Sequence, residues 1–287
     1  MKTRSMKCTF VGVFTESSTN FSQFHALRKE GCEIQTFAYR DIAKKVGREE
    51  RDAMLIGEVK RFSPDVLLIA KGNTIDADTI KECNKHTKSV LWFMDTLYTW
   101  NRELEEKIEA CNVVACAWKG PYRRACMMSN NVYHVIEGYD ETLEKPVSVE
   151  QSVLVSFIGS LQGDRPRYVE AVNAVVFQDA YGAQHSVVVS KSKININLTR
   201  RGGTSDRVYK VLAAKGFLLS QKWDGMEEEL CPGKDFVLFD NPESLTEKVN
   251  YYLTHNDERE SIREHGYQTV QKYTRREWAK KILEIAK

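Results

Sequence analysis

Short apolar runs alternate with amphipathic stretches along most of the chain, and this alternation limits the folds that the chain can adopt. The first run, KCTFVGVF, is followed by NFSQFHALRKEG, in which Phe21, Phe24 and Leu27 share one helical face. The pattern continues through DVLLIA, SVLWFMD and NVVACAW, with helical stretches between them. Continuous apolar strands separated by amphipathic helices are typical of parallel sheets covered by helices. The sequence therefore predicts an α/β fold.

The alternation lapses once, at residues 138–153, where GYDETLEKPVSVEQSV contains a proline, several charges and no period. A second series then begins with SVLVSFIG and continues through KININLT, GFLLSQ and FVLFD. A chain of 287 residues also exceeds the usual size of one domain. We therefore expect two α/β domains with a cleft between them, at residues 1–150 and 151–287.

The charges nearly balance, with 42 Lys and Arg residues against 40 Asp and Glu residues, and 42% of the chain is hydrophobic. This composition excludes a disordered or fibrous protein. The net charge of +2 is small for a dedicated nucleic-acid binder, although a local basic patch stays open. No apolar run of about 18 residues occurs, so we expect no membrane span, no secretory signal and a cytoplasmic location.

Residues with metal-binding or disulfide chemistry show no suitable spacing. The seven cysteines form no Cys-x-x-Cys pair, and none lies at zinc-ligand spacing from a histidine. Asp76-Ala77-Asp78 has the spacing of a metal-binding Asp-x-Asp pair, but it precedes a helical pattern, which favours helix capping. The six histidines form no helical ligand pair, and core or surface positions are expected for them. We therefore expect no metal and no disulfide.

Ligands of open parallel sheets bind beyond the carboxyl ends of the strands, so the residues after each apolar run are the candidates for a site. TRRGGTSDR combines two glycines, hydroxyl residues and three arginines directly before a helical pattern. The amides of Gly203, Thr204 and Ser205, together with Arg207, would suit an anion at the start of that helix. A flexible capped loop with solvated arginines is an equally open interpretation.

The stretch IGSLQGDRPR is a second candidate anion site. Gly159 permits a tight turn before Ser160, and Arg165 or Arg167 would reach toward the cleft. Taken alone, the stretch favours an ordinary strand–helix connection. Two anion sites that open into one cleft suit a diphosphate better than a single phosphate, so a nucleoside-diphosphate ligand is expected.

Candidates for acid–base chemistry lie in the first half of the chain. Asp95 ends an unusually apolar strand and is flanked by aromatic residues, among them Trp100. Partial desolvation would make this carboxylate a stronger base toward an acceptor hydroxyl, and the aromatics would stack on a sugar or a base. Helix capping beside core aromatics is the alternative. Glu16 is the rival base, and Ser17 and Ser18 beside it are, with Trp100, candidate acceptor contacts.

The second half of the chain resembles the donor-binding domain of glycosyltransferases with the GT-B fold, in the CgeB-like branch. The segments that carry this resemblance are VSFIGSLQGDRPRYVEAV, KININLT, SDRVYKVLAAKGFLLS, CPGKDFVLFDNPESLTEKVNYYL and YTRREWAKKIL. They cover nearly all of residues 153–287, and YHVIEGYDETLEKP is similar to the segment that closes the first domain in that branch. The N-terminal half is similar only in pattern.

The resemblance implies two Rossmann-like domains facing a cleft, with a nucleotide sugar bound mainly by the second domain. It also implies transfer of the sugar to an acceptor without a metal, and a UDP-sugar is the expected donor. Gly159, Ser160 and Arg165 match the turn that opens the donor domain, and Ser205 and Arg207 match the start of the donor helix. Phosphate contacts are the implied role of these residues.

The donor helix departs from the family at one position. The family has Phe-Glu-Ala-Leu-Ala-Cys-Gly, whereas this chain has YKVLAAK, with Lys210 in place of the glutamate. That carboxylate would accept hydrogen bonds from the ribose hydroxyls, and a lysine only donates them, so Lys210 is a candidate phosphate contact instead. A noncatalytic nucleotide-sugar-binding module and a nucleotide-sugar epimerase are therefore alternatives to a glycosyltransferase.

The donor domain is short between Val175 and Ser190, as it is in small phage-type enzymes of this kind. Some of those enzymes modify hydroxymethylated bases in DNA, so the analogy implies a DNA acceptor, in the host cytoplasm for a phage-encoded chain. The basic residues that would contact a nucleic-acid backbone are Lys119, Arg123, Arg124, Arg200 and Arg201. Solvated helix and loop charges are an equally open interpretation.

Overall fold

The chain folds into two compact units, and the computed structural model describes residues 5–199 and 203–287 of it. Unit 1 comprises Met1–Glu137 and Arg275–Lys287, and unit 2 comprises Gly138–Thr274. This division differs from the expected domains in two places, because unit 2 begins before residue 151 and the C-terminal helix belongs to unit 1. Arg200, Arg201 and Gly202 lie outside the described residues.

Within its described residues, unit 1 has one sheet of six parallel strands in the order β2-β1-β3-β4-β5-β6. The strands are β1 (Lys7–Val11), β2 (Glu33–Phe37), β3 (Val66–Ala70), β4 (Lys88–Phe93), β5 (Val113–Cys116) and β6 (Val132–His134). All five residues of β3, VLLIA, are buried, because β3 is a central strand with helices on both faces of the sheet. The strand order reverses between β1 and β3, which is where ligands bind in open parallel sheets.

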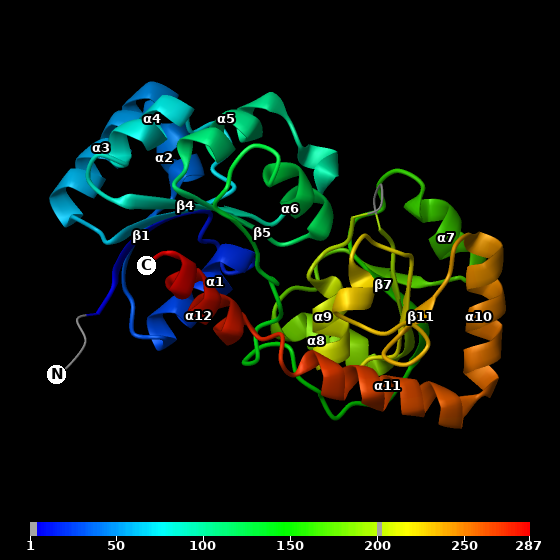
Figure 1. Ribbon diagram of the computed structural model, residues 1–287. Coiled ribbons are helices and arrows are strands. Elements are labelled where there is room, and N and C mark those ends of the chain that lie inside the picture. Colours follow the sequence, from blue (N-terminus) through cyan, green and yellow to red (C-terminus); the bar gives the residue numbers. More distant parts are fainter. Residues whose placement is uncertain (1–4, 200–202) are drawn as a thin grey trace. The chain divides into compact units, whose positions relative to one another are not determined.

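The helices of unit 1 cover its sheet on both sides. They are α1 (Thr19–Lys29), α2 (Tyr39–Val46), α3 (Arg48–Phe62), α4 (Ala77–Cys83), α5 (Arg102–Ala110), α6 (Lys119–Ala125), α12 (Arg275–Ile285) and the 3-10 helix η1 (Leu97–Thr99). Figure 1 shows α2, α3, α4 and α5 on one face of the sheet, and α1 and α12 side by side on the other.

The C-terminal helix α12 belongs to unit 1 because its apolar stripe covers that sheet. Trp278 and Ile282 are buried, and the Trp278 ring lies 5.6 Å from the ring of Trp92 on β4. Arg275 is also buried, and its Nη1 donates to the carbonyl oxygen of Glu137 at 2.8 Å. Burial of each large side chain contributes roughly 1.5–3 kcal/mol, so α12 is an integral part of this core.

Unit 2 has one sheet of five parallel strands among its described residues, in the order β11-β10-β9-β7-β8. The strands are β7 (Val153–Ile158), β8 (Val175–Phe177), β9 (Ser192–Asn197), β10 (Leu218–Ser220) and β11 (Val237–Leu238). The helices are α7 (Arg165–Ala171), α8 (Ala183–Lys191), α9 (Arg207–Ala213), α10 (Pro242–Thr254), α11 (Asn256–Val270) and the 3-10 helix η2 (Met226–Glu228). Helix α7 packs with α10, and α9 packs with both α8 and α11 (Figure 1).

The two parallel sheets confirm the predicted fold class. In unit 2 the strand order reverses between β7 and β9, because β8 lies on one side of β7 and the later strands lie on the other. The turns after β7 and β9 diverge at this point and leave space for a ligand at the carboxyl ends of the strands.

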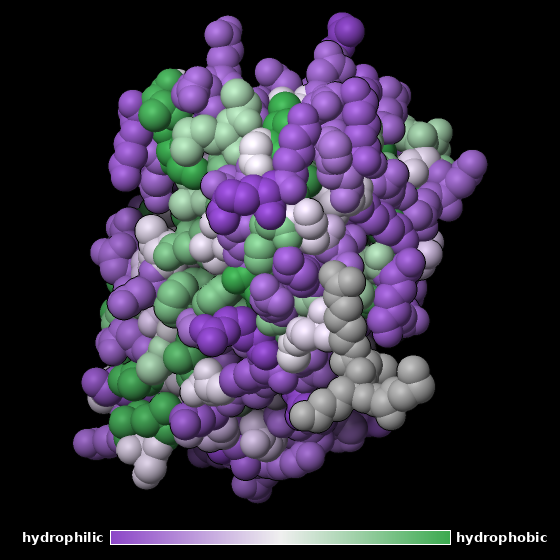
Figure 2. Space-filling model, turned by 90° about the vertical axis from the view of Figure 1, so that its left-hand side faces the viewer, coloured by the Kyte–Doolittle hydropathy of each residue, from purple (hydrophilic) through white to green (hydrophobic). Residues whose placement is uncertain are grey.

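One face of the molecule is shown by hydropathy in Figure 2. Figure 2 shows that hydrophilic side chains predominate on the face in view, and that the apolar ones form small scattered groups. Among the helices that the structure describes, none combines the length and the apolar character that crossing a membrane requires.

Candidate functional site

A cavity of about 370 Å³ lies in unit 2 at the carboxyl end of β7. Three segments line it: the turn after β7, the loop after β8 with the start of α8, and the first turn of α9. Its lining residues are Ile158, Gly159, Ser160, Gln178, Asp179, Ala180, Tyr181, Gly182, His185, Asp206, Arg207 and Lys210. The cavity therefore occupies the position where the strand order reverses.

Gly159 brings the turn after β7 close to Arg207. Its φ of +145° lies in a region that residues with a side chain rarely adopt. A Cβ atom at this position would lie 2.7 Å from Nη2 of Arg207, which is closer than van der Waals contact allows. Both the backbone conformation and the space for the guanidinium group therefore require glycine here.

Arg207 is held in place by strand β9 and by an aromatic ring. Its Nη1 donates to Oδ1 of Asn197 at 3.1 Å, and its guanidinium carbon lies 5.4 Å from the centre of the Phe157 ring. The amide nitrogen of Asn197 in turn donates to Oγ1 of Thr204 at 3.0 Å and to Oγ of Ser220 at 2.9 Å. Burial and the neighbouring positive charge of Arg165 lower the pKa of Arg207 to about 10, so the group stays cationic at neutral pH.

Arg165 adds a second guanidinium group on the side of the turn after β7. Its Nη1 donates to the carbonyl oxygen of Ser160 at 3.0 Å, and its Nη2 donates to the carbonyl oxygen of Leu198 at 3.3 Å. It also lies over the ring of Phe157, 5.6 Å from the ring centre. Phe157 therefore has both guanidinium groups beside it, and these are groups that donate charge-assisted hydrogen bonds to an anion.

Lys210 lies one turn after Asp206 on the same side of α9, and its Nζ is 2.8 Å from the Asp206 carboxylate. Both residues line the cavity. Lys210, which the resemblance aligned with a glutamate, is thus a cation that contacts an acidic neighbour in the preceding turn. This pair keeps a carboxylate at the cavity wall.

Four of the eight predicted donor-binding residues line the cavity: Gly159, Ser160, Arg207 and Lys210. Arg165 lies beside them, and buried Thr204 supports Asn197. Gly203 and Ser205 are half-buried in the segment before α9 and are not lining residues. Helix α9 has only seven residues, so its N-terminus attracts an anion weakly, and the arginines are the main groups that would bind one.

Sequence reasoning missed the wall of the cavity that the loop after β8 and helix α8 provide. Residues 178–182 follow no motif, and His185 was expected in a core or surface position. His185 is only 5% exposed, and neither ring nitrogen has a hydrogen-bond partner among the described residues. Because Phe177 is the last residue of β8, the rule that sites follow strands identifies this loop, but only once that short strand is recognised.

In unit 1, Asp95 lies directly after β4 and forms an ion pair. Nζ of Lys71, which follows β3, donates to Oδ1 of Asp95 at 2.7 Å, and the two side chains are 28% and 32% exposed. The aromatic residue Trp100 is half-buried, and its Nε1 donates to Glu105 at 2.7 Å. The sequence pointed to aromatic neighbours for Asp95 but did not reveal its cationic partner.

The remaining candidates of unit 1 are more exposed or have structural roles. Ser18 is the N-cap of α1: its Oγ accepts from the Phe21 amide at 3.3 Å and donates to the Val13 carbonyl oxygen at 2.6 Å. Glu16 and Ser17, in the loop after β1, are exposed, and so is Arg123 on α6. Asp95 is therefore the less exposed of the two candidate bases.

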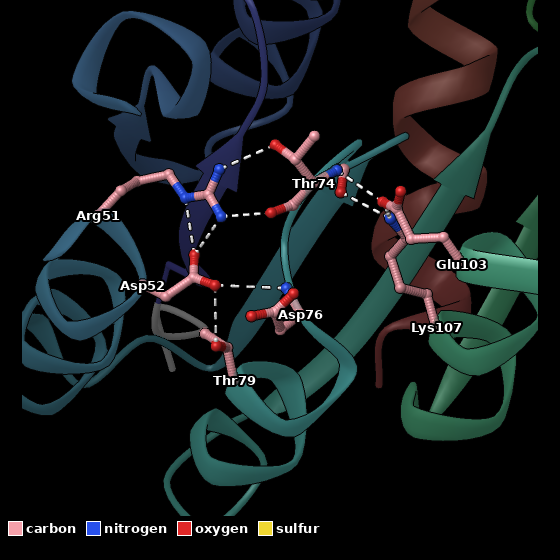
Figure 3. Close-up of polar contacts among 8 residues, drawn as sticks. Arg51, Asp52, Thr74, Asp76, Thr79, Glu103 and Lys107 are labelled. Atoms are coloured by element: carbon pink, nitrogen blue, oxygen red, sulfur yellow. Dashed lines mark hydrogen bonds and ion pairs between the residues drawn. The ribbon is translucent and has the colours of Figure 1, made fainter. Parts of the chain in front are cut away.

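A buried polar network supports the loop that carries Lys71 (Figure 3). Arg51 on α3 has no exposed side-chain surface; its Nε donates to Asp52 at 2.7 Å, and its Nη1 donates to Oγ1 of Thr74 at 3.0 Å. On the other side, Nζ of Lys107 donates to the Gly72 carbonyl oxygen at 2.9 Å. Lys71 and Thr74 have φ angles of 60° and 67°, which non-glycine residues adopt only when surrounding contacts enforce them.

Two α/β units of this topology match the GT-B fold of glycosyltransferase structures. Residues 147–284 match the family model described as glycosyl transferase-like. Comparison of the sequence with curated proteins finds no match.

Several solved structures are similar in fold to this protein over nearly its whole length. HepE from Anabaena, solved in complex with UDP and glucose, has a TM-score of 0.77 at 10% identity, over 97% of this chain and 98% of that one. Sucrose-phosphate synthase from Thermosynechococcus elongatus has a TM-score of 0.72 at 9% identity, over 98% of each chain. A glycosyltransferase from Rickettsia africae has a TM-score of 0.71 at 11% identity, over 99% of this chain and 98% of that one.

Proposed function

We propose that the protein is a glycosyltransferase that moves a sugar from a nucleoside-diphosphate sugar, a UDP-sugar first among them, to an acceptor hydroxyl. The observation that carries this proposal is the cavity at the end of β7, where Gly159 makes room for Arg207 beside Lys210. An arginine that lines a polar cavity suits a diphosphate, because a guanidinium group donates paired hydrogen bonds to phosphate oxygens. The complexes of HepE with UDP and with UDP-glucose support the same ligand class for a related fold.

In the proposed reaction, Asp95 accepts the proton of the acceptor hydroxyl. The acceptor oxygen then forms a bond to the anomeric carbon as the bond from that carbon to the diphosphate oxygen breaks. The nucleoside diphosphate leaves with an additional negative charge, which Arg207 and Arg165 stabilise electrostatically without a metal. The products are the glycosylated acceptor and the nucleoside diphosphate, and the proton on Asp95 returns to water.

The first candidate for the acceptor is a hydroxymethylated base in DNA. Helix α6 supports this choice, because Arg123 and Arg124 are exposed on it next to Tyr122. The guanidinium of Arg124 also lies 4.9 Å from the ring centre of Trp100. Exposed arginines next to aromatic rings suit phosphates and bases respectively. A cytoplasmic location of the protein is part of this proposal, because the DNA acceptor would be found there.

The experiment that tests the function measures nucleoside-diphosphate release from a panel of nucleotide sugars. Each donor is incubated alone, with DNA that contains hydroxymethylcytosine and with matched unmodified DNA. Release that depends on the modified DNA supports both the reaction and the acceptor, whereas release that is indifferent to DNA supports the reaction and excludes this acceptor. Conversion of the free donor to another sugar indicates an epimerase, and binding without any turnover indicates a noncatalytic module.

The role of Asp95 is tested in the same assay with two matched variants. Asp95→Asn keeps the shape of the side chain but removes the base, so we expect turnover to fall by about 10²-fold or more. Glu16→Gln is the control, because Glu16 is the rival base and is exposed. A larger loss in Glu16→Gln than in Asp95→Asn would assign the base to Glu16 instead.

A further inference from the structure

His185 projects from the first turn of α8 into the wall of the cavity and is buried without a hydrogen-bond partner. Its exposed fraction is 5%, and both Nδ1 and Nε2 lack a partner among the described residues. Buried polar groups nearly always have partners, since an unpaired one loses its hydrogen bonds to water and gains nothing in return. A side chain in this state at a cavity wall is a group that a ligand would complete.

The charges around His185 determine which part of a ligand it can contact. Burial, and then the positive charges of Lys210 and Arg207, lower the pKa of His185 to about 3, although Asp206 opposes this shift. The ring is therefore neutral at physiological pH. A neutral imidazole has one N–H donor and one acceptor nitrogen, so its best partner is a neutral group that both donates and accepts.

Phosphate oxygens do not meet this requirement, because they only accept and because Arg207 and Lys210 already supply charged donors in the same cavity. Hydroxyl groups of a ribose and the amide edge of a base do meet it. We infer that His185 is a specificity-determining residue that holds the nucleoside part of the donor nucleotide, while the cations of the same cavity hold its diphosphate. This inference rests on the proposed function, since it presupposes a nucleotide ligand in this cavity.

Two observations on the neighbouring loop agree with a nucleoside at this wall. The loop after β8 brings Gln178 and Asp179 to the same cavity, and both carry neutral or acceptor oxygens rather than cationic groups. Tyr181, which also lines the cavity, is 56% exposed and presents an aromatic ring. The cavity thus has both of its lining cations, Arg207 and Lys210, on the α9 side with Asp206, whereas the loop after β8 and α8 bring no cation to it.

The test compares binding of UDP and of inorganic diphosphate to the full chain by calorimetry. His185→Phe keeps a planar ring and removes both nitrogens, so we expect about a tenfold or greater loss of UDP affinity, with inorganic diphosphate affinity kept within about twofold. Gln184→Ala is the matched control, because Gln184 is the exposed neighbour of His185 on α8 and does not line the cavity. Repeating the comparison with 2′-deoxy-UDP distinguishes a ribose contact from a base contact.

If His185→Phe loses affinity equally for UDP and inorganic diphosphate, or for neither, the role of His185 is overturned. The proposed function still stands in that case, provided that the wild-type protein binds UDP. Wild-type protein that binds inorganic diphosphate but no nucleoside diphosphate would instead overturn both. If His185→Phe does not fold, the imidazole nitrogen resonances of the wild-type protein give the answer. UDP, but not inorganic diphosphate, is expected to shift those of His185, and unchanged resonances on UDP binding would overturn the inference.

Discussion

In unit 1 the loop after β3 is fixed by residues of the protein itself, whereas the cavity wall of unit 2 includes His185, whose ring nitrogens have no partner in residues 5–199 and 203–287. The loop after β3 is supported by hydrogen bonds of Lys107 and of the buried pair Arg51 and Asp52. Lys71, which this loop carries, forms an ion pair with Asp95. No residue in the described part of the chain partners the ring nitrogens of His185. The difference teaches that the protein alone shapes the first loop, whereas under our proposal a ligand completes the cavity of unit 2.

The largest expected effect tests the support of the first loop. Arg51→Met removes a fully buried cation and leaves the Asp52 carboxylate buried beside an apolar side chain, so we expect about 3–5 kcal/mol of destabilisation. Denaturation followed by tryptophan fluorescence reports mainly on unit 1, which contains four of the five tryptophans. Arg48→Ala, at an exposed position on the same helix, is the control and should be near neutral. Similar midpoints for the two variants would show that the network does not hold the loop.

The second prediction concerns the cationic wall of unit 2. Arg207→Ala should lower turnover by about 10²-fold, because the leaving diphosphate loses a preorganised positive charge. Arg167→Ala removes an exposed arginine of α7 and should leave turnover within about twofold. Steady-state assays of nucleoside-diphosphate release give both numbers. Arg207→Ala protein with wild-type turnover would remove Arg207 from the mechanism.

The third prediction uses the pH dependence of stability. The pKa of His185 is about 3 in the folded protein, against an ordinary value of 6.5, so below pH 6.5 the unfolded chain takes up a proton that the folded protein does not. Folding therefore loses about 2 kcal/mol through this group when the pH falls from 7 to 5. Hydrogen exchange of the slowest amides of unit 2 should show this loss in the wild-type protein, and a smaller one in His185→Phe. Equal losses in the two proteins would mean that the ring takes up its proton as readily in the folded protein as in the unfolded chain.

The smallest effect separates backbone strain from crowding. Gly159→Ala and Gly163→Ala both place a side chain at positive φ, at about 1–2 kcal/mol each, but only the Cβ at 159 meets Arg207. We expect both variants to melt earlier and only Gly159→Ala to bind UDP less tightly, by about tenfold. Calorimetry on the two folded variants makes the comparison. Equal affinities would show that Arg207 moves aside without consequence.

The fold was predictable because the central strand β3 is an uninterrupted apolar run, and shorter apolar runs recur between amphipathic stretches along the chain. The five buried residues of β3 show why: a strand covered on both faces has no polar positions, so its signal in the sequence is strong. The place of α12 was not predictable in the same way. Its period reveals which face is apolar, but not that this face packs on Trp92 in unit 1.

The candidate site in unit 2 was partly predictable for a related reason. Gly159 stands directly after β7, and Arg207 opens the helix that follows β9, where the carboxyl-end rule directs attention. His185 stands inside a helix after a strand of only three residues, and its importance comes from the absence of a partner, which is a property of three-dimensional packing. The same holds for Lys71, whose pairing with Asp95 depends on adjacent strands.

Unit 2 is nested within unit 1 in the sequence, and its two ends meet, since the Tyr139 amide donates to the Tyr273 carbonyl oxygen at 3.1 Å. Unit 2 is therefore one contiguous segment whose ends lie side by side, whereas unit 1 is built from two separate segments. During synthesis, the first sheet leaves the ribosome long before residues 275–285 do. The contact between Trp92 and Trp278 forms only after α12 has been synthesised. The first core is therefore completed last, after the inserted unit 2 has been made.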